Sequence, residues 1–235
     1  TPRDAGQETA PIEASTLAET GTDAGFDSSV DVTPEAGPDA AEAGAKVLLS
    51  LQTSWRQTCA NISTGDVVGK GPVAVKCWGS NSSGELGIGD MQTRGNLPGQ
   101  MGGLLPEVDL GAGHTPKQLA GAGSFSCALT EAGRIKCWGQ NNAGELGLGD
   151  ALPRGEAPGE MGANLPTTDL DGLVATQITT GFNHVCARTD QGTVKCWGQN
   201  NDGRLGVGDI VNRGDNPGQM GATLPAVDVA ASALE

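Results

Sequence analysis

The stretch Cys127-Ala-Leu-Thr-Glu-Ala-Gly-Arg-Ile-Lys-Cys-Trp-Gly139 decides the fold, because it has the pattern of a β-hairpin and recurs along the chain. Its turn residues, Thr130 to Gly133, lie midway between two cysteines, and strand-forming residues flank them. Similar Cys-Trp-Gly blocks begin at Cys77 and Cys196, 60 residues before and 59 residues after the block at Cys137. This period is typical of one supersecondary unit of a repeat protein, such as a β-propeller blade.

The six cysteines form three pairs, and the hairpin midpoints predict which cysteines are joined. Opposed residues of two antiparallel strands have Cα atoms about 4.5–5.5 Å apart, which suits a disulfide. The turn of the first copy is eight residues longer, yet its midpoint, Val68, still lies within Thr64 to Gly71. We therefore expect three disulfides within hairpins: Cys59–Cys77, Cys127–Cys137 and Cys186–Cys196.

Zinc binding or free thiols are the alternatives for these cysteines. Zinc sites need closely spaced Cys and His residues, and neither His114 nor His184 completes such a cluster. Because disulfides persist in oxidising environments, the cysteines predict a protein that is secreted, periplasmic or exposed at the cell surface. We expect no metal and no cofactor.

The first 45 residues differ in composition from the rest. Thr1 to Ala45 holds ten acidic residues and one basic residue, so it carries −9 of the formal charge of −14. Its apolar residues are single and follow neither a helical nor an alternating period. This segment is expected to be a disordered acidic tether that is dispensable for stability, with an ordinary flexible terminus as the alternative. Residues 46–235 form the repeat region.

Composition excludes several classes of partner. Binding to DNA or RNA needs clustered Lys and Arg, and the 14 basic residues here are scattered singly. No apolar run is long enough to form a membrane-spanning helix. The chain begins at Thr1 without Met or a signal sequence, which suggests a processed or trimmed product.

The second copy serves as the template for one blade. Its pattern predicts four antiparallel strands separated by Gly-marked turns and, before the last strand, by a long loop rich in Gly, Asn and Pro over 140–166. The expected strands are Lys117–Ala120, Phe125–Thr130, Arg134–Gly139 and Thr167–Leu170. The same pattern places the three blades at about 47–110, 117–170 and 176–229.

The motif after each hairpin has a family resemblance. Residues Gly133-Arg-Ile-Lys-Cys-Trp-Gly-Gln-Asn-Asn-Ala-Gly-Glu-Leu-Gly-Leu-Gly149 resemble the repeat of the regulator of chromosome condensation family, in a Cys-Trp-Gly variant of a secreted bacterial type. The first and third copies match over Trp78–Gly89 and Trp197–Gly208. The resemblance implies an all-β propeller that binds proteins, as do a nuclear exchange factor for a small GTPase and a secreted bacterial inhibitor of β-lactamases.

The chain departs from the family in two ways. The family's His before the second strand is kept only as His184, with Gln57 and Phe125 at the other two positions. Family members usually close seven blades into a ring, whereas three are present here. Either this sequence is part of a longer propeller, or copies of the chain associate, two chains giving six blades.

Several other residues recur once in each copy, and each set has a structural and a functional interpretation. The acids that follow Gly-x-Gly could bind calcium, but an ion pair with the arginine four residues later is favoured. The tryptophans could stack on a sugar, but packing in the core is favoured. The methionines of the long loops either contact a partner or pack under the loop, and the asparagines fasten the loop backbone. These sets are Asp90, Asp150 and Asp209; Arg94, Arg154 and Arg213; Trp78, Trp138 and Trp197; Met101, Met161 and Met220; and Asn81, Asn141 and Asn200.

No nucleophile, base and orienting group converge in the sequence, so it predicts no enzyme. The leading hypothesis is a secreted or surface-tethered module that binds a protein partner through its long loops. A carbohydrate-binding module or glycan hydrolase that uses Glu85 and Glu145 is the alternative, weakened because Arg204 stands at that place in the third copy. A passive structural repeat is the third hypothesis.

Overall fold

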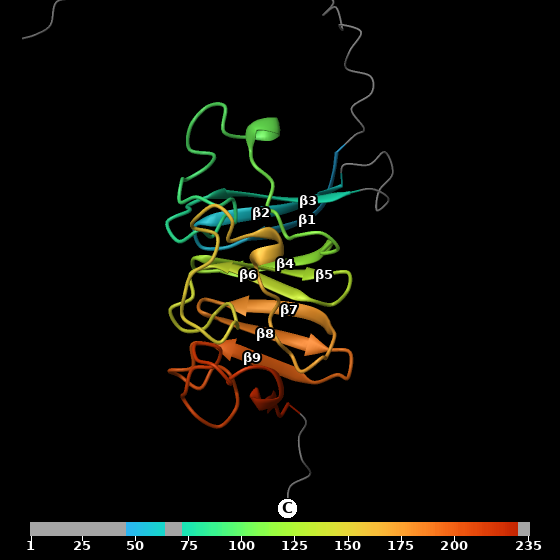
Figure 1. Ribbon diagram of the computed structural model, residues 1–235, viewed down its shortest axis with the longest axis vertical. Helices are drawn as coiled ribbons and strands as arrows, with labels where there is room; N and C mark the ends of the chain where they lie inside the picture. Colours follow the sequence, from blue (N-terminus) through green and yellow to red (C-terminus); the bar gives the residue numbers. More distant parts are fainter. Residues whose placement is uncertain (1–45, 64–71, 230–235) are drawn as a thin grey trace, which may run out of the picture. The chain divides into compact units, whose positions relative to one another are not determined.

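Three antiparallel sheets follow one another in the computed structural model, which describes residues 46–63 and 72–229 (Figure 1). The expected tether Thr1–Ala45 lies outside the described residues. The first sheet contains β1 (Val47–Thr53), β2 (Gln57–Ser63) and β3 (Val73–Gly79), and the second contains β4 (Pro116–Ala122), β5 (Phe125–Thr130) and β6 (Ile135–Gly139). The third contains β7 (Ala175–Gly181), β8 (His184–Thr189), β9 (Val194–Gly198) and β10 (Ala226–Val227).

The central hairpin of each blade has the register that the cysteines predict. Cys127 lies opposite Cys137 in the β5–β6 ladder, and the other two pairs are opposed in the same way. A disulfide joins each opposed pair, with Cα atoms 4.1 Å apart, and together the three bonds account for all six cysteines. The all-β prediction is confirmed, and β5 has the bounds expected from the sequence.

The fourth strand of each blade is shorter than expected. In the third blade it is β10, two residues long. In the other two it is reduced to single backbone bonds, from Val108 N to Val75 O (2.8 Å) and from Thr168 N to Ile135 O (2.9 Å). The next residue turns toward the following blade, because the carbonyl of Asp169 accepts a bond from Gly221 N. The segment thus lies between two blades and cannot extend a ladder with either.

The hydrophobic core lies between successive blades. One buried cluster joins residues of the first and second blades around Trp138, and another joins residues of the second and third around Trp197. Both indole rings are fully buried. The first strands of neighbouring blades also contact each other, β1 with β4 and β4 with β7. Among the described residues, no helix is long and apolar enough to cross a membrane.

Candidate partner-binding end of the blades

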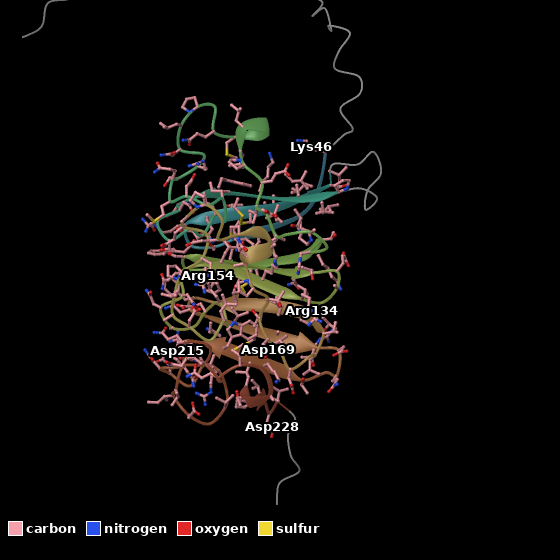
Figure 2. All side chains as sticks on the ribbon, viewed as in Figure 1. Lys46, Arg134, Arg154, Asp169, Asp215 and Asp228 are labelled. Carbon is pink, nitrogen blue, oxygen red and sulfur yellow. A yellow bond between two sulfur atoms is a disulfide. The ribbon has the colours of Figure 1, made fainter. Side chains whose placement is uncertain are left out.

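The long loops and the turns before the second strands meet at one end of the blades. Each loop begins beside such a turn, as the bonds from Ser80 N to Arg56 O and from Gln199 N to Asn183 O show (2.9 and 2.8 Å). The loops gather on the left of Figure 1. In Figure 2, Arg154 of the second loop lies on this side and Arg134, in the β5–β6 turn, lies on the opposite side. We call this left side the loop end.

A buried asparagine fastens each long loop. The amide of Asn141 donates to the carbonyl of Asp150 (2.8 Å), and its oxygen accepts a bond from Leu146 N (2.9 Å). Asn81 and Asn200 make the same pair of contacts. Because all three side chains are fully buried, these bonds hold the loop backbone in one conformation.

An Asp–Arg pair then braces the tip of each loop. The guanidinium–carboxylate distances are 2.5, 2.7 and 2.6 Å in the first, second and third blades. Each carboxylate also accepts the N–H two residues later, and each arginine donates to the carbonyl of that same residue. The backbone N–H of Val211 and then Arg213 lower the pKa of Asp209. The pairs are Asp90–Arg94, Asp150–Arg154 and Asp209–Arg213, and each encloses three residues.

Each braced tip exposes an apolar side chain. The exposed fractions are 54% for Met91, 62% for Leu152, 69% for Ile210 and 55% for Val211. Exposed apolar side chains that lie between the Asp and the Arg of every long loop form a repeated surface feature, unlike scattered single ones. Since hydrogen bonds already fix the backbone, these tips lose little conformational freedom on binding. We call these four residues the loop tips.

A cluster of exposed aromatic residues also lies at the loop end. The rings of Trp55 and Phe182 are 5.7 Å apart, and the guanidinium of Arg56 lies 5.2 Å from the centre of the Trp55 ring. The turn of the middle blade lies between them and has Gly123 at the equivalent place, where a Cβ would come within 2.6 Å of Phe182 O. Sequence reasoning missed this cluster, although aligning the three copies places the two aromatic residues at one turn position.

The loop methionines are not at the loop tips. Met161 and Met220 are partly buried and pack against the two clusters between blades. Met101 has the equivalent position in the first blade and is 41% exposed. The structure therefore places these residues at the faces through which blades contact each other.

The role of the lysine that precedes each Cys-Trp-Gly block was also missed by sequence reasoning. Lys136 is buried and donates to the carbonyl of Gly162 (2.8 Å), while Lys195 donates to Gly221 (2.9 Å). Burial lowers the pKa of Lys136, and the nearby Asp109 carboxylate opposes that shift. These bonds hold the short 3-10 helices η1 (Gly102–Leu104), η2 (Gly162–Asn164) and η3 (Gly221–Thr223) against their own sheets.

Two of the repeated tryptophans, Trp138 and Trp197, and the two repeated glutamates belong to the contacts between blades. Trp138 Nε1 donates to the carbonyl of Glu85, and Trp197 Nε1 donates to the carbonyl of Glu145 (3.0 Å each). Both glutamate side chains are buried and accept backbone N–H groups of their own loops. Neither carboxyl group is placed to reach a glycan, because the next blade covers each of them.

Replacing Glu145 with Gln is expected to make stability less sensitive to pH. Burial raises the pKa of Glu145 above its ordinary value of 4.5. The folded state therefore binds this proton more tightly than the unfolded state, and the stability gained from it is lost as pH rises through the folded pKa. The Glu145→Gln variant should gain stability over the wild type as the pH rises above the ordinary carboxyl pKa, measured by urea unfolding.

Glu160→Gln is the matched control for this prediction. Glu160 accepts the N–H groups of Gly155, Glu156 and Ala157, and Gln100 and Gln219 make such contacts in the other two loops. The free energies of unfolding of Glu145→Gln and the wild type should differ by an amount that changes with pH. A difference that stays constant would contradict the raised pKa of Glu145.

Comparison with known proteins gives one consistent family. The sequence model of the regulator of chromosome condensation (RCC1) repeat matches residues 118–145 and 175–204. The chain is 34% identical over 138 residues to the RCC1 domain-containing protein RUG3, mitochondrial, of Arabidopsis thaliana, covering 58% of this chain and 28% of that protein. It is 32% identical to the ultraviolet-B receptor UVR8 of the same plant, covering 56% and 27%. The chain thus spans less than a third of these relatives.

Solved structures show the same fold. Prp20p from Saccharomyces cerevisiae, described with its binding properties to Gsp1p and histones, superposes with a TM-score of 0.51 at 17% identity, covering 75% of this chain and 39% of that one. Yeast RCC1 (Prp20) in a structure with bound Kap60 gives 0.50, covering 75% and 37%. This likeness places the three sheets as consecutive blades of a propeller.

Proposed function

This chain carries repeats of the regulator of chromosome condensation family, and from that premise we propose that it is a non-catalytic module that binds a protein partner through its loop tips. The yeast relative is described with binding to Gsp1p and histones and in a complex with Kap60. Both descriptions support protein binding as the use of this scaffold. The partner of this chain is a separate matter, because fold does not fix function.

The observation that carries the proposal is the repeated, braced and exposed loop tip. A buried asparagine and an Asp–Arg pair hold each long loop, and every loop exposes at least one large apolar side chain between the Asp and the Arg. Apolar side chains on a rigid backbone can bury apolar surface against a partner at little cost in conformational freedom. Trp55 and Arg56 at the same end add two residue types that are enriched among the anchors of protein interfaces.

We further propose that the protein works in an oxidising compartment, as a secreted, periplasmic or surface-tethered protein. Its three disulfides, which involve every cysteine of the chain, are compatible with such a compartment. The acidic segment Thr1–Ala45 would serve as the spacer to a surface in this proposal.

Binding is tested with a variant in which all four loop tips, Met91, Leu152, Ile210 and Val211, are changed to Ser. Wild type and variant are immobilised and exposed to an extract of the source cells, and the retained protein is purified and bound again to each. The affinity of the variant is expected to fall about tenfold or more, since interface anchors cost over about 1 kcal/mol each when truncated. Folding should be unaffected, because the four side chains are exposed.

Val174→Ser is the matched control for the loop tips. Val174 is 39% exposed and lies at the opposite end of the blades, where its carbonyl accepts a bond from Asp190 N. Equal binding by the tip variant and the Val174→Ser variant would refute the proposed surface. If neither the wild type nor either variant retains any protein from the extract, a passive structural repeat is favoured.

The exposed aromatic cluster is the one observation that favours the carbohydrate-binding alternative, because an exposed indole can stack on a sugar ring. A glycan array probed with wild type and the Trp55→Ala variant separates the two functions. Glycan binding that the Trp55→Ala change abolishes would replace the protein-binding proposal.

A further inference from the structure

The contact between neighbouring blades is made twice with the same groups. In each case an indole N–H of the later blade donates to a glutamate carbonyl of the earlier one, and a glycine N–H donates to an aspartate carbonyl. The bonds are Trp138–Glu85 (3.0 Å) and Gly162–Asp109 (2.9 Å) for the first contact, and Trp197–Glu145 (3.0 Å) and Gly221–Asp169 (3.1 Å) for the second.

Glycines on both sides permit this close approach. On the earlier blade, a Cβ added to Gly84 would lie 2.5 Å from Glu156 N, and one added to Gly144 would lie 2.3 Å from Asp215 N. On the later blade, a Cβ at Gly162 or Gly221 would come within 2.4 or 2.5 Å of an aspartate carboxylate oxygen. Any side chain at these positions would therefore separate the two blades.

The same positions are open on the two outer blades. Gly203 of the third blade corresponds to Gly84 and Gly144, and the nearest atom to its added Cβ is Asp209 O, 3.9 Å away. Gly102 of the first blade corresponds to Gly162 and Gly221, and nothing lies within 4 Å. Within residues 46–63 and 72–229, the first and the third blade thus each present one unused half of the contact.

The first blade also presents the donor and the apolar surface of the contact. Trp78 is partly exposed, and among the described residues no acceptor bonds to its Nε1, whereas the indoles of Trp138 and Trp197 are buried and bonded. A hollow of about 360 Å³ lies at this face, lined by Leu48, Ile62, Trp78, Met101 and neighbouring residues. Leu48 and Leu51 are more than half exposed.

We propose that the outer face of the third blade of one chain docks on the outer face of the first blade of a second copy, and so makes the contact between blades a third time. The acceptor for Trp78 Nε1 is then the backbone carbonyl of Arg204. Since both existing bonds use a backbone carbonyl, the change from Glu to Arg at this place keeps the acceptor.

The second copy is the favoured occupant because the two open halves are complementary and lie on one polypeptide. Two such contacts between two chains would close six blades into a ring. Closure covers the apolar hollow and the exposed leucines of the first blade at one end of each chain, and that burial drives association. This inference is independent of the loop tips, which lie outside the contact.

The proposal is tested with the full 235-residue chain and three Asn variants in sedimentation and light-scattering experiments over a range of concentrations. Gly203→Asn and Gly102→Asn place a side chain in the contact, while Gly192→Asn is the control. All three glycines have φ between 68° and 78°, a conformation that Asn tolerates. An added Cβ would meet no atom closer than 3.9 Å among the described residues of the single chain.

Wild type and Gly192→Asn are expected to associate equally. For Gly203→Asn and Gly102→Asn, the dissociation constant should be about tenfold higher than for the wild type, or more. A mixture of Gly203→Asn and Gly102→Asn tests directly whether the third blade of one chain contacts the first blade of another. Each variant alone lacks one half of the contact, but together they retain one intact pair of faces and should form a one-to-one complex that grows no further.

Three results would overturn the proposal. The first is a wild-type chain that stays monomeric at every concentration. The second is association of Gly203→Asn alone that equals the wild type, which would indicate contact between two first blades. The third is an equal effect of Gly192→Asn. Circular dichroism and thermal melting of each variant show whether it is folded, so a misfolded variant is not counted as a dissociated one.

Discussion

Trp138→Ala is expected to lower the free energy of unfolding by about 3–5 kcal/mol, the range found when a large aromatic side chain is removed from a core. The indole is fully buried between the first and second blades. Its loss also removes one of the two donors to the buried carbonyl of Glu85, the other being Ser126 Oγ at 3.1 Å, and the lost hydrogen bond adds to the cost. Urea unfolding at fixed pH measures the change.

Trp78→Ala is the matched control, because Trp78 has the same repeat position without a preceding blade in the described residues. Its ring is partly exposed and makes no hydrogen bond to any residue that the structure describes. At concentrations where copies are apart, we expect less than half of the loss seen for Trp138→Ala. Equal losses would mean that the tryptophan acts within its own blade and that the contacts between blades contribute little.

Removing one disulfide with Cys127→Ala and Cys137→Ala together is expected to cost about 3 kcal/mol. The bond closes an 11-residue loop, for which the restriction of the unfolded chain alone amounts to about 2.8 kcal/mol. Both sulfur atoms are buried, so packing adds to the loss. Urea unfolding of the variant and the wild type under oxidising conditions measures it, and the same comparison under strong reductant should show a much smaller difference.

A result that contradicts this prediction is also clear. If the variant were as stable as the wild type under oxidising conditions, or if native protein held six alkylatable cysteines, the pairing would not form in the protein. The inferred oxidising compartment would then lose its support.

The hairpins were predictable from sequence because the determining contacts are local. The turn residues and the equal distance of Cys127 and Cys137 from the turn fix the register, and the structure has the same register. The fourth strand was not predictable in this way. The Thr167–Leu170 segment makes one bond to its own sheet and then one to the next blade, and no feature of the segment itself indicates that division.

In the candidate site, too, the contacts between residues close in sequence were predictable and those between blades were not. The Asp150–Arg154 pair joins residues four positions apart and was expected from spacing alone. The contact between Trp55 and Phe182 crosses an entire blade and depends on Gly123 having no side chain. Likewise, the burial of Met161 and Met220 follows from the neighbouring blade, which a repeat examined singly does not reveal.

The disulfides also bear on how such a protein changes its length in evolution. Each bond joins two neighbouring strands of one blade, and none links one blade to another. Duplication or deletion of one whole repeat therefore gains or loses cysteines two at a time, with both members of a bond together. No cysteine is left unpaired, and the glycine-lined faces make the same contact with whichever blade becomes adjacent. The number of blades can therefore change in evolution without any change in how disulfides form in the remaining blades.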